Sequence, residues 1–168
     1  NEETPPQIPE WERWNDYGIG SLLKGKAELR QAQEAFRKVE GLRRYDGPLN
    51  LARALFAEGR LDEAVDAVRR AAAFTEPAAP PWTVAWLSGL INRAQGRLEQ
   101  AEQNLRSVLS PPTAEMLERG FDFRLDYEVI NVLGQVLFDR ARQERGPERE
   151  AARRALLTEA VELFEKTL

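Results

Sequence analysis

The sequence predicts an all-α protein made of stacked antiparallel helix pairs. Half of the 168 residues are Ala, Leu, Glu or Arg, which are strong helix formers, whereas the β-branched residues Val, Ile and Thr supply only 19. Apolar residues recur at helical spacing in short segments, and glycine or proline separates one segment from the next. A turn motif also recurs along the chain, which indicates repeated units rather than one closed core.

In the first half of the chain, three prolines among residues 1–9 predict an extended lead-in. Amphipathic stripes then predict four helices, because the apolar side chains of each segment fall on one face. They are expected over about residues 10–24, 28–41, 49–58 and from 61 to the proline-rich stop at 76–81. The connections within each pair are short, so the paired helices must pack as antiparallel neighbours.

The second half continues in the same way, with breaks at Gly96, Ser110-Pro111-Pro112 and Gly146-Pro147. Helices are expected over about residues 82–94, 98–109, 114–119, 127–143 and 148–168. Residues 113–126 are expected to be irregular apart from the short helix. Their Phe121-Asp122-Phe123 segment is expected to cover the junction between the third and fourth helix pairs.

Three of the turns share one pattern. A small residue makes the turn, Leu begins the next helix, Ala follows three residues later, and a large apolar residue comes four after that. The pattern runs from Ala27 to Phe36, from Gly59 to Val68 and from Gly96 to Leu105, and successive copies are 32 and 37 residues apart. Such a period is typical of solenoid proteins.

The pattern resembles the tetratricopeptide repeat, whose unit is two antiparallel helices over about 34 residues. The family's first-helix positions are matched by Ile19, Gly20 and Leu23, by Leu51, Ala52 and Leu55, and by Gly89, with Trp86 one residue from the aromatic position. The resemblance implies one domain over residues 10–168, a right-handed α-solenoid of about four repeats. The units are expected at approximately 14–46, 47–80, 81–112 and 127–168, with the insert 113–126 before the last.

Small residues are expected where the helices of a unit cross, because they let two backbones approach closely. Gly20, Ala52 and Gly89 take this position in the first helices, each 12 residues before Ala32, Ala64 or Ala101 in the second. The fourth unit departs from the pattern, since Gly134 and Ala160 are 26 residues apart.

Members of this family bind peptides or proteins in a concave groove lined by the first helices, so the resemblance implies such a groove here. The residues beside the packed stripes are expected to face it: Trp14, Tyr17, Ser21, Lys24, Leu49, Arg53, Phe56, Thr83, Trp86, Leu90, Arg93, Glu128, Asn131, Gln135 and Phe138. Asn50 is added to the expected groove residues because of a second comparison. Some members of the family bind carboxylates with a Lys/Asn/Arg set, and Asn50, Arg53 and Arg93 are the only residues here that are similar to it. The match is too scattered to transfer that specificity.

Aromatic and Arg side chains dominate the energetics of many interfaces. Arg53 and Arg93 can each hold a carboxylate through two hydrogen bonds, and Phe56 and Trp86 can receive apolar side chains. The expected partner is therefore a protein or peptide with acidic groups or a C-terminal carboxylate. The alternative for each residue is structural, with the aromatic rings wedged between repeats and the Arg heads in solvent.

Composition excludes several classes of function. The chain has no His and no Cys, which removes His general bases, thiolate nucleophiles, thiolate zinc sites and disulfides. We therefore expect no enzymatic activity, no cofactor and no metal site, and Asp122, Asp126 and Asp139 are interpreted as helix caps or ion-pair partners. The net charge of −4 disfavours nucleic-acid binding, and no apolar run is long enough to suggest a membrane partner.

Two other functions stay open at this point. The chain is expected to be a fragment of a longer repeat protein, since it begins with Asn and ends without a closing turn. It is then either the non-catalytic repeat segment of a larger enzyme or electron-transfer protein, or a domain that self-associates through exposed solenoid ends. The absence of Cys is compatible with both the cytoplasm and the periplasm, and the compartment is left unknown.

Overall fold

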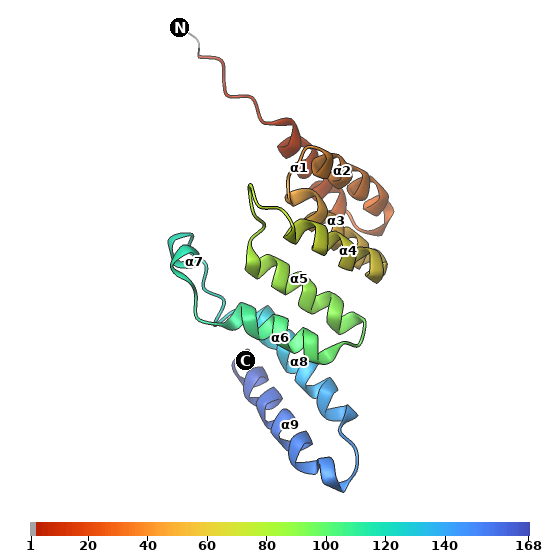
Figure 1. The fold of residues 1–168 in the computed structure, drawn as a ribbon, viewed down its shortest axis with the longest axis vertical. Helices are drawn as coiled ribbons and strands as arrows, with labels where there is room; N and C mark the ends of the chain where they lie inside the picture. The colour runs from red at the N-terminus through yellow and green to blue at the C-terminus, as the bar shows by residue number, and fades with distance from the viewer. Residues whose placement is uncertain (1–2) are drawn as a thin grey trace. The chain divides into compact units, whose positions relative to one another are not determined.

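The computed structural model describes residues 3–168, and their regular structure is helical apart from an isolated bridge between Thr75 and Ala78 (Figure 1). The all-α prediction is confirmed for this part of the chain. The chain divides after Val84 into two compact units, which are described one by one. In residues 3–168 no helix combines the length and hydrophobicity that crossing a bilayer requires.

The first unit is built from four helices in which each packs against the next along the chain. They are α1 (Glu10–Leu23), α2 (Leu29–Gly41), α3 (Asp46–Glu58) and α4 (Leu61–Ala72). Phe36 and Val39 of α2, Ala52 of α3 and Ala64 of α4 are completely buried, and Leu51 and Leu55 of α3 are nearly so. The amphipathic stripes of α2, α3 and α4 therefore form the core of this unit. The stripe of α1 was predicted wrongly, because α1 buries only Gly18 and Ser21 and leaves Tyr17 and Leu23 exposed.

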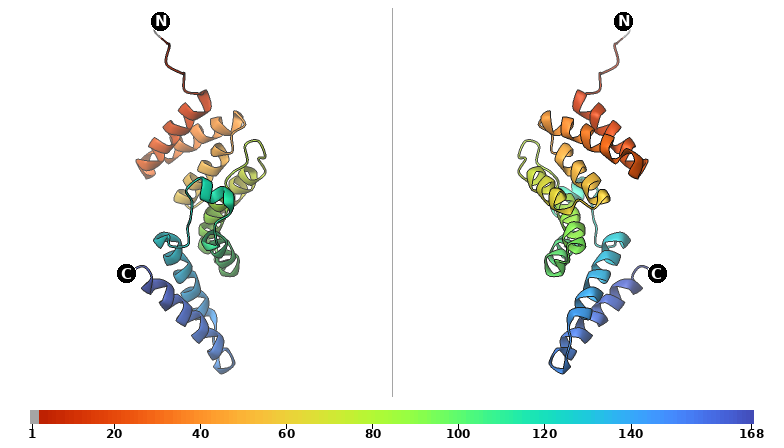
Figure 2. Two further views of the ribbon diagram at one scale, coloured as in Figure 1. Left: turned by 90° about the vertical axis from the view of Figure 1, so that its left-hand side faces the viewer. Right: turned by 90° about the vertical axis from the view of Figure 1, so that its right-hand side faces the viewer.

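The second unit holds most of α5 (Pro81–Ala94), then α6 (Leu98–Leu109), α7 (Ala114–Glu118), α8 (Tyr127–Gln143) and α9 (Glu150–Glu165). Its core is an apolar cluster contributed by α6, α8 and α9, with Ala85 and Trp86 of α5 packed against it. Helices α8 and α9 pack along each other and are joined by residues 144–149 (Figure 2).

The crossing of α1 and α2 corrects one prediction. A Cβ atom added to Gly18 would lie 2.5 Å from Cε1 of Phe36, whereas one added to Gly20 would have no atom within 4 Å. Gly18, and not Gly20, therefore takes the close-contact position. The reason is the connection between the helices, which contains an additional 3-10 turn at Lys26–Glu28 and so shifts the register.

The turn residue of that connection also differs from the prediction. Gly25 has a positive φ of 91° and makes the turn, in place of Ala27. Gly59 and Gly96 make the turns expected of them, with φ of 82° and 77°, because a residue without Cβ adopts this left-handed region without strain. The Gly-Arg-Leu turns were thus predicted correctly and the Ala-Glu-Leu turn was not.

Helix α3 begins three residues earlier than predicted, because Asp46-Gly47-Pro48 forms its first turn rather than a break. A proline fits there, since the first N–H groups of a helix have no intrahelical acceptor. Gly47 is needed for a different reason: a Cβ at this position would lie 2.3 Å from the backbone nitrogen of Glu40. The start of α3 therefore packs directly against the end of α2.

The segment 113–126 is ordered by two helix caps. The Thr113 hydroxyl accepts a hydrogen bond of 3.2 Å from the backbone N–H of Met116, and the Asp126 carboxylate accepts one of 3.0 Å from that of Val129. Asp122 forms an ion pair of 2.7 Å with Arg124. The cap and ion-pair interpretations of Asp126 and Asp122 are confirmed, and Phe123 packs on the core cluster, as its covering role requires.

Candidate functional site

The residues expected to line a groove are divided between the two units. The first unit holds Trp14, Tyr17, Lys24, Asn50, Arg53 and Phe56, and the second holds Trp86, Arg93, Asn131, Gln135 and Phe138. Two further residues expected to face the groove, Ser21 and Leu49, are buried, with 3% and 5% of their surface exposed, so they cannot contact a ligand.

Three polar side chains, joined by two hydrogen bonds, link α1 to α3 in the first unit. The Nδ2 of Asn50 donates a hydrogen bond of 2.8 Å to Oδ1 of Asn15, and the Nη1 of Arg53 donates one of 2.9 Å to Oδ1 of Asn50. Asn50 is only 6% exposed, so its amide is fixed by packing as well as by these bonds. The Arg53 guanidinium is therefore held in one orientation from its α3 position.

Arg53 carries a positive charge that no carboxylate of residues 3–168 neutralises through an ion pair. Its side chain is half-buried, and this burial lowers the pKa of the guanidinium from its ordinary value. A guanidinium stays protonated in proteins even so, since its ordinary pKa lies far above neutral pH. An oriented and partly desolvated cation is a favourable site for an anionic group, because bonds between opposite charges are stronger where water is excluded.

The aromatic residues of α1 differ in how accessible they are. The Trp14 ring is covered on one side by Lys38 of α2, whose Nζ lies 3.7 Å from the ring centroid. Tyr17 meets Trp14 edge-on, with ring centroids 6.1 Å apart, and is 55% exposed. Tyr17 is therefore the α1 aromatic that can contact a partner, while one face of Trp14 is already occupied.

The remaining predicted residues of the first unit have smaller roles at this surface. Lys24 lies at the end of α1, where its Nζ is 3.7 Å from Glu28, and its side chain is largely exposed. Phe56 is half-buried on α3, three residues after Arg53 and so on the same helix face. Phe56 can therefore supply apolar surface beside the Arg53 guanidinium.

In the second unit, α8 carries Asn131, Gln135 and Phe138 on one face, at spacings of four and three residues. Asn131 accepts a hydrogen bond of 3.0 Å from the Thr167 hydroxyl, while Gln135 and Phe138 are exposed. On α5, Trp86 packs against the core cluster and Arg93 is half-buried. Trp86 therefore contributes to the core, in line with the structural alternative for this residue.

Asn15 is the residue of this site that sequence reasoning missed. It is polar and lies between Trp14 and Asp16 on an amphipathic helix, which gives no sign of a contact with a helix that begins some 30 residues later. The signal was its distance of 35 residues from Asn50, close to the period of the turn motif.

The surface around Arg53 presents amide and guanidinium groups to solvent or to a ligand. Within residues 3–168, no group of three or more acidic side chains is arranged to hold a metal ion. Asn15, Asn50 and Arg53 offer amide and guanidinium groups, which hold an anion but do not transfer a proton near neutral pH.

No model of a known protein family matches the sequence, and no curated protein matches it significantly.

Proposed function

We infer that the chain is a tetratricopeptide-like interaction domain that binds a peptide or partner protein. Three features support this function: the consecutive antiparallel helix pairs, the Gly-Arg-Leu turns at Gly59 and Gly96, and the small residues buried at helix crossings. In the second unit Gly89 lies against Leu105, and in the first Gly18 lies against Phe36, so the same kind of crossing occurs in both.

The ligand that fits the first unit is an acidic segment or a free C-terminal carboxylate. Arg53 carries this proposal, because its guanidinium is oriented by Asn50 and has no carboxylate of its own. A carboxylate bound there would accept charge-assisted hydrogen bonds from the guanidinium. Tyr17 and Phe56 would supply apolar contact for the residues beside the carboxylate.

The test is a binding measurement with an array of peptides made twice, once with a free C-terminal carboxylate and once amidated. We expect the free and acidic peptides to bind better, and Arg53→Ala to weaken the best of them by about 2 kcal/mol, which is typical of an anchoring Arg. Arg53→Lys should restore only part of this loss, since an ammonium cannot form two parallel bonds.

The matched control is Arg69→Ala, which removes the same charge from an exposed position on α4. An equal loss of affinity for Arg69→Ala and Arg53→Ala would show that only net charge matters and would contradict the Arg53 site.

A further inference from the structure

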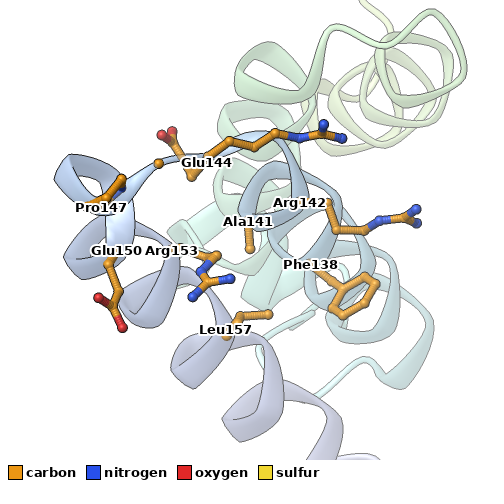
Figure 3. Close-up of a pocket in the computed structure, with 10 residues that line it drawn as sticks. Phe138, Ala141, Arg142, Glu144, Pro147, Glu150, Arg153 and Leu157 are labelled. Carbon is orange, nitrogen blue, oxygen red and sulfur yellow. The ribbon is translucent and has the colours of Figure 1, made fainter.

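A second surface with the chemistry of a binding site lies wholly within the second unit. It is a hollow of about 630 Å³ beside the loop that joins α8 to α9 (Figure 3). Hollows of this size accommodate small molecules or a few side chains of a peptide. Asn15, Asn50 and Arg53 do not line this hollow, so the two surfaces can be tested independently.

The base of this hollow is apolar. Ala141 of α8 is buried, Leu157 of α9 is half-buried, and the ring of Phe138 is 44% exposed. Phe138 continues the face of α8 that carries Gln135, so the hollow lies at the C-terminal end of the predicted groove face of this helix. An exposed aromatic ring beside a half-buried Leu is a surface that an apolar side chain can cover.

Three arginines line the same hollow: Arg142 and Arg145 near the end of α8, and Arg153 on α9. Figure 3 shows Ala141 and Leu157 lying between Arg153 on one side and Phe138 with Arg142 on the other. The guanidinium carbon of Arg142 is 6.0 Å from the centroid of the Phe138 ring. Positive charge and apolar surface are thus adjacent within one site.

The two carboxylates at the hollow do not neutralise these arginines. Glu144 pairs with Arg149 at 3.7 Å, and Glu150 pairs with Arg154 at 2.8 Å. Arg149 and Arg154 are not among the lining residues. Within residues 3–168, Arg142, Arg145 and Arg153 have no ion pair, so the hollow offers three free guanidinium groups to a ligand.

We propose that this hollow binds an acidic peptide segment of a partner protein, with one large apolar side chain on Phe138 and Leu157 and flanking carboxylates on Arg142 and Arg153. Separated arginines fit several carboxylates spaced along a peptide better than one compact anion. The apolar base between them fits a side chain of the same segment. Side-chain carboxylates suffice here, so the site requires no free C-terminus.

The experiment uses the full chain and a fluorescein-labelled ten-residue peptide, acetylated and amidated, with one Phe between two pairs of Glu in a Gly and Ser background. Capped ends remove the terminal carboxylate, which is one of the two groups proposed to bind Arg53, and the Arg53→Ala variant tests whether the Glu side chains bind there instead. Fluorescence anisotropy should show saturable binding. Arg142→Gln or Arg153→Gln should each weaken it on the order of tenfold, as expected for hydrogen bonds between charged groups.

Controls separate this site from general charge attraction. Arg69→Gln removes an equal charge from α4 in the other unit and should leave the affinity within about twofold. A peptide with Gly in place of the central Phe should bind more weakly to the wild type. Phe138→Ala should reduce this difference between the two peptides, and the exposed ring makes the substitution compatible with folding.

Several results would overturn the proposal. One is an equal loss for Arg69→Gln and Arg142→Gln, and another is a Phe138→Ala variant that still distinguishes the two peptides as the wild type does. Tighter binding of pyrophosphate or of a short RNA, lost in the same Arg variants, would assign the hollow to a different ligand. Loss of the capped peptide in Arg53→Ala alone would place its binding in the first unit instead.

Discussion

At the crossing of α1 and α2, the aromatic ring of Phe36 lies directly against the backbone of Gly18. Three atoms of the ring would be within 2.9 Å of an added Cβ, and Phe36 is completely buried. Because Phe36 is completely buried and protein interiors are packed at crystal-like density, moving its ring aside costs free energy. One hydrogen atom at Gly18 therefore sets how closely the two helices approach.

Gly18 and Gly20 give a matched pair of substitutions in one helix. Gly18→Ala should lower the free energy of unfolding, because overpacking of about 1–3 kcal/mol exceeds the gain of about 1 kcal/mol in helix propensity. Gly20→Ala meets no atom within 4 Å, so it should gain up to about 1 kcal/mol. Urea unfolding followed by circular dichroism checks both, and two equal changes would contradict the assigned crossing.

Among the elements, α8 links the core of the second unit to its surface sites. It contributes Val129, Ile130, Leu133, Val136 and Leu137 to the core cluster. The opposite face carries Gln135 and Phe138 and leads to the hollow beside α9. Its first turn is stabilised by Asp126, whose carboxylate accepts from Val129 and lies at the positive end of the helix dipole.

The Asp126 cap of α8 is expected to contribute to the stability of the protein. Asp126→Ala should cost about 1 kcal/mol of stability, because the first turn of the helix loses an acceptor. Asp122→Ala is the control, since the pair that Asp122 forms with Arg124 is exposed and contributes little. Thermal unfolding of the two variants separates them, and a larger loss for Asp122→Ala would exclude the cap as the main stabilising contact.

Across the whole molecule, the sequence predicted elements well where a local signal ends each helix. The predicted bounds of α6 and α8 match the structure, because Gly96, Ser110-Pro111 and the Gly146-Pro147 break act on their immediate neighbours. Prediction was wrong where packing decides, as in the choice of Gly18 over Gly20.

The same distinction applies to the candidate site. Arg53 and Asn50 could be selected by residue type and by their positions on one predicted helix. Asn15 could not be selected by residue type. Its spacing of 35 residues from Asn50 was the one indication, and the hydrogen bond itself depends on how α1 packs against α3. The hollow beside α9 was missed for a similar reason. Its arginines are free only because Glu144 and Glu150 pair with Arg149 and Arg154, and the interleaved Arg and Glu of this stretch do not reveal which partners they take.

The composition of the whole chain also predicts that it binds zinc only weakly. With no His and no Cys, only carboxylates and neutral oxygens remain as ligands, whereas structural zinc sites in proteins are built from Cys and His. Many of the carboxylates are also paired with arginines, as Glu40 is with Arg70 at 2.9 Å. Isothermal titration with zinc at pH 7 should therefore show no stoichiometric site of sub-micromolar affinity.

The positive control is the double variant Asp62→His with Asp66→His. It places two His side chains one turn apart on α4 and so creates a pair of ligands on one exposed face. Tight zinc binding by the unaltered chain would contradict the prediction and assign the protein a site that neither its residue types nor its ion pairs suggest.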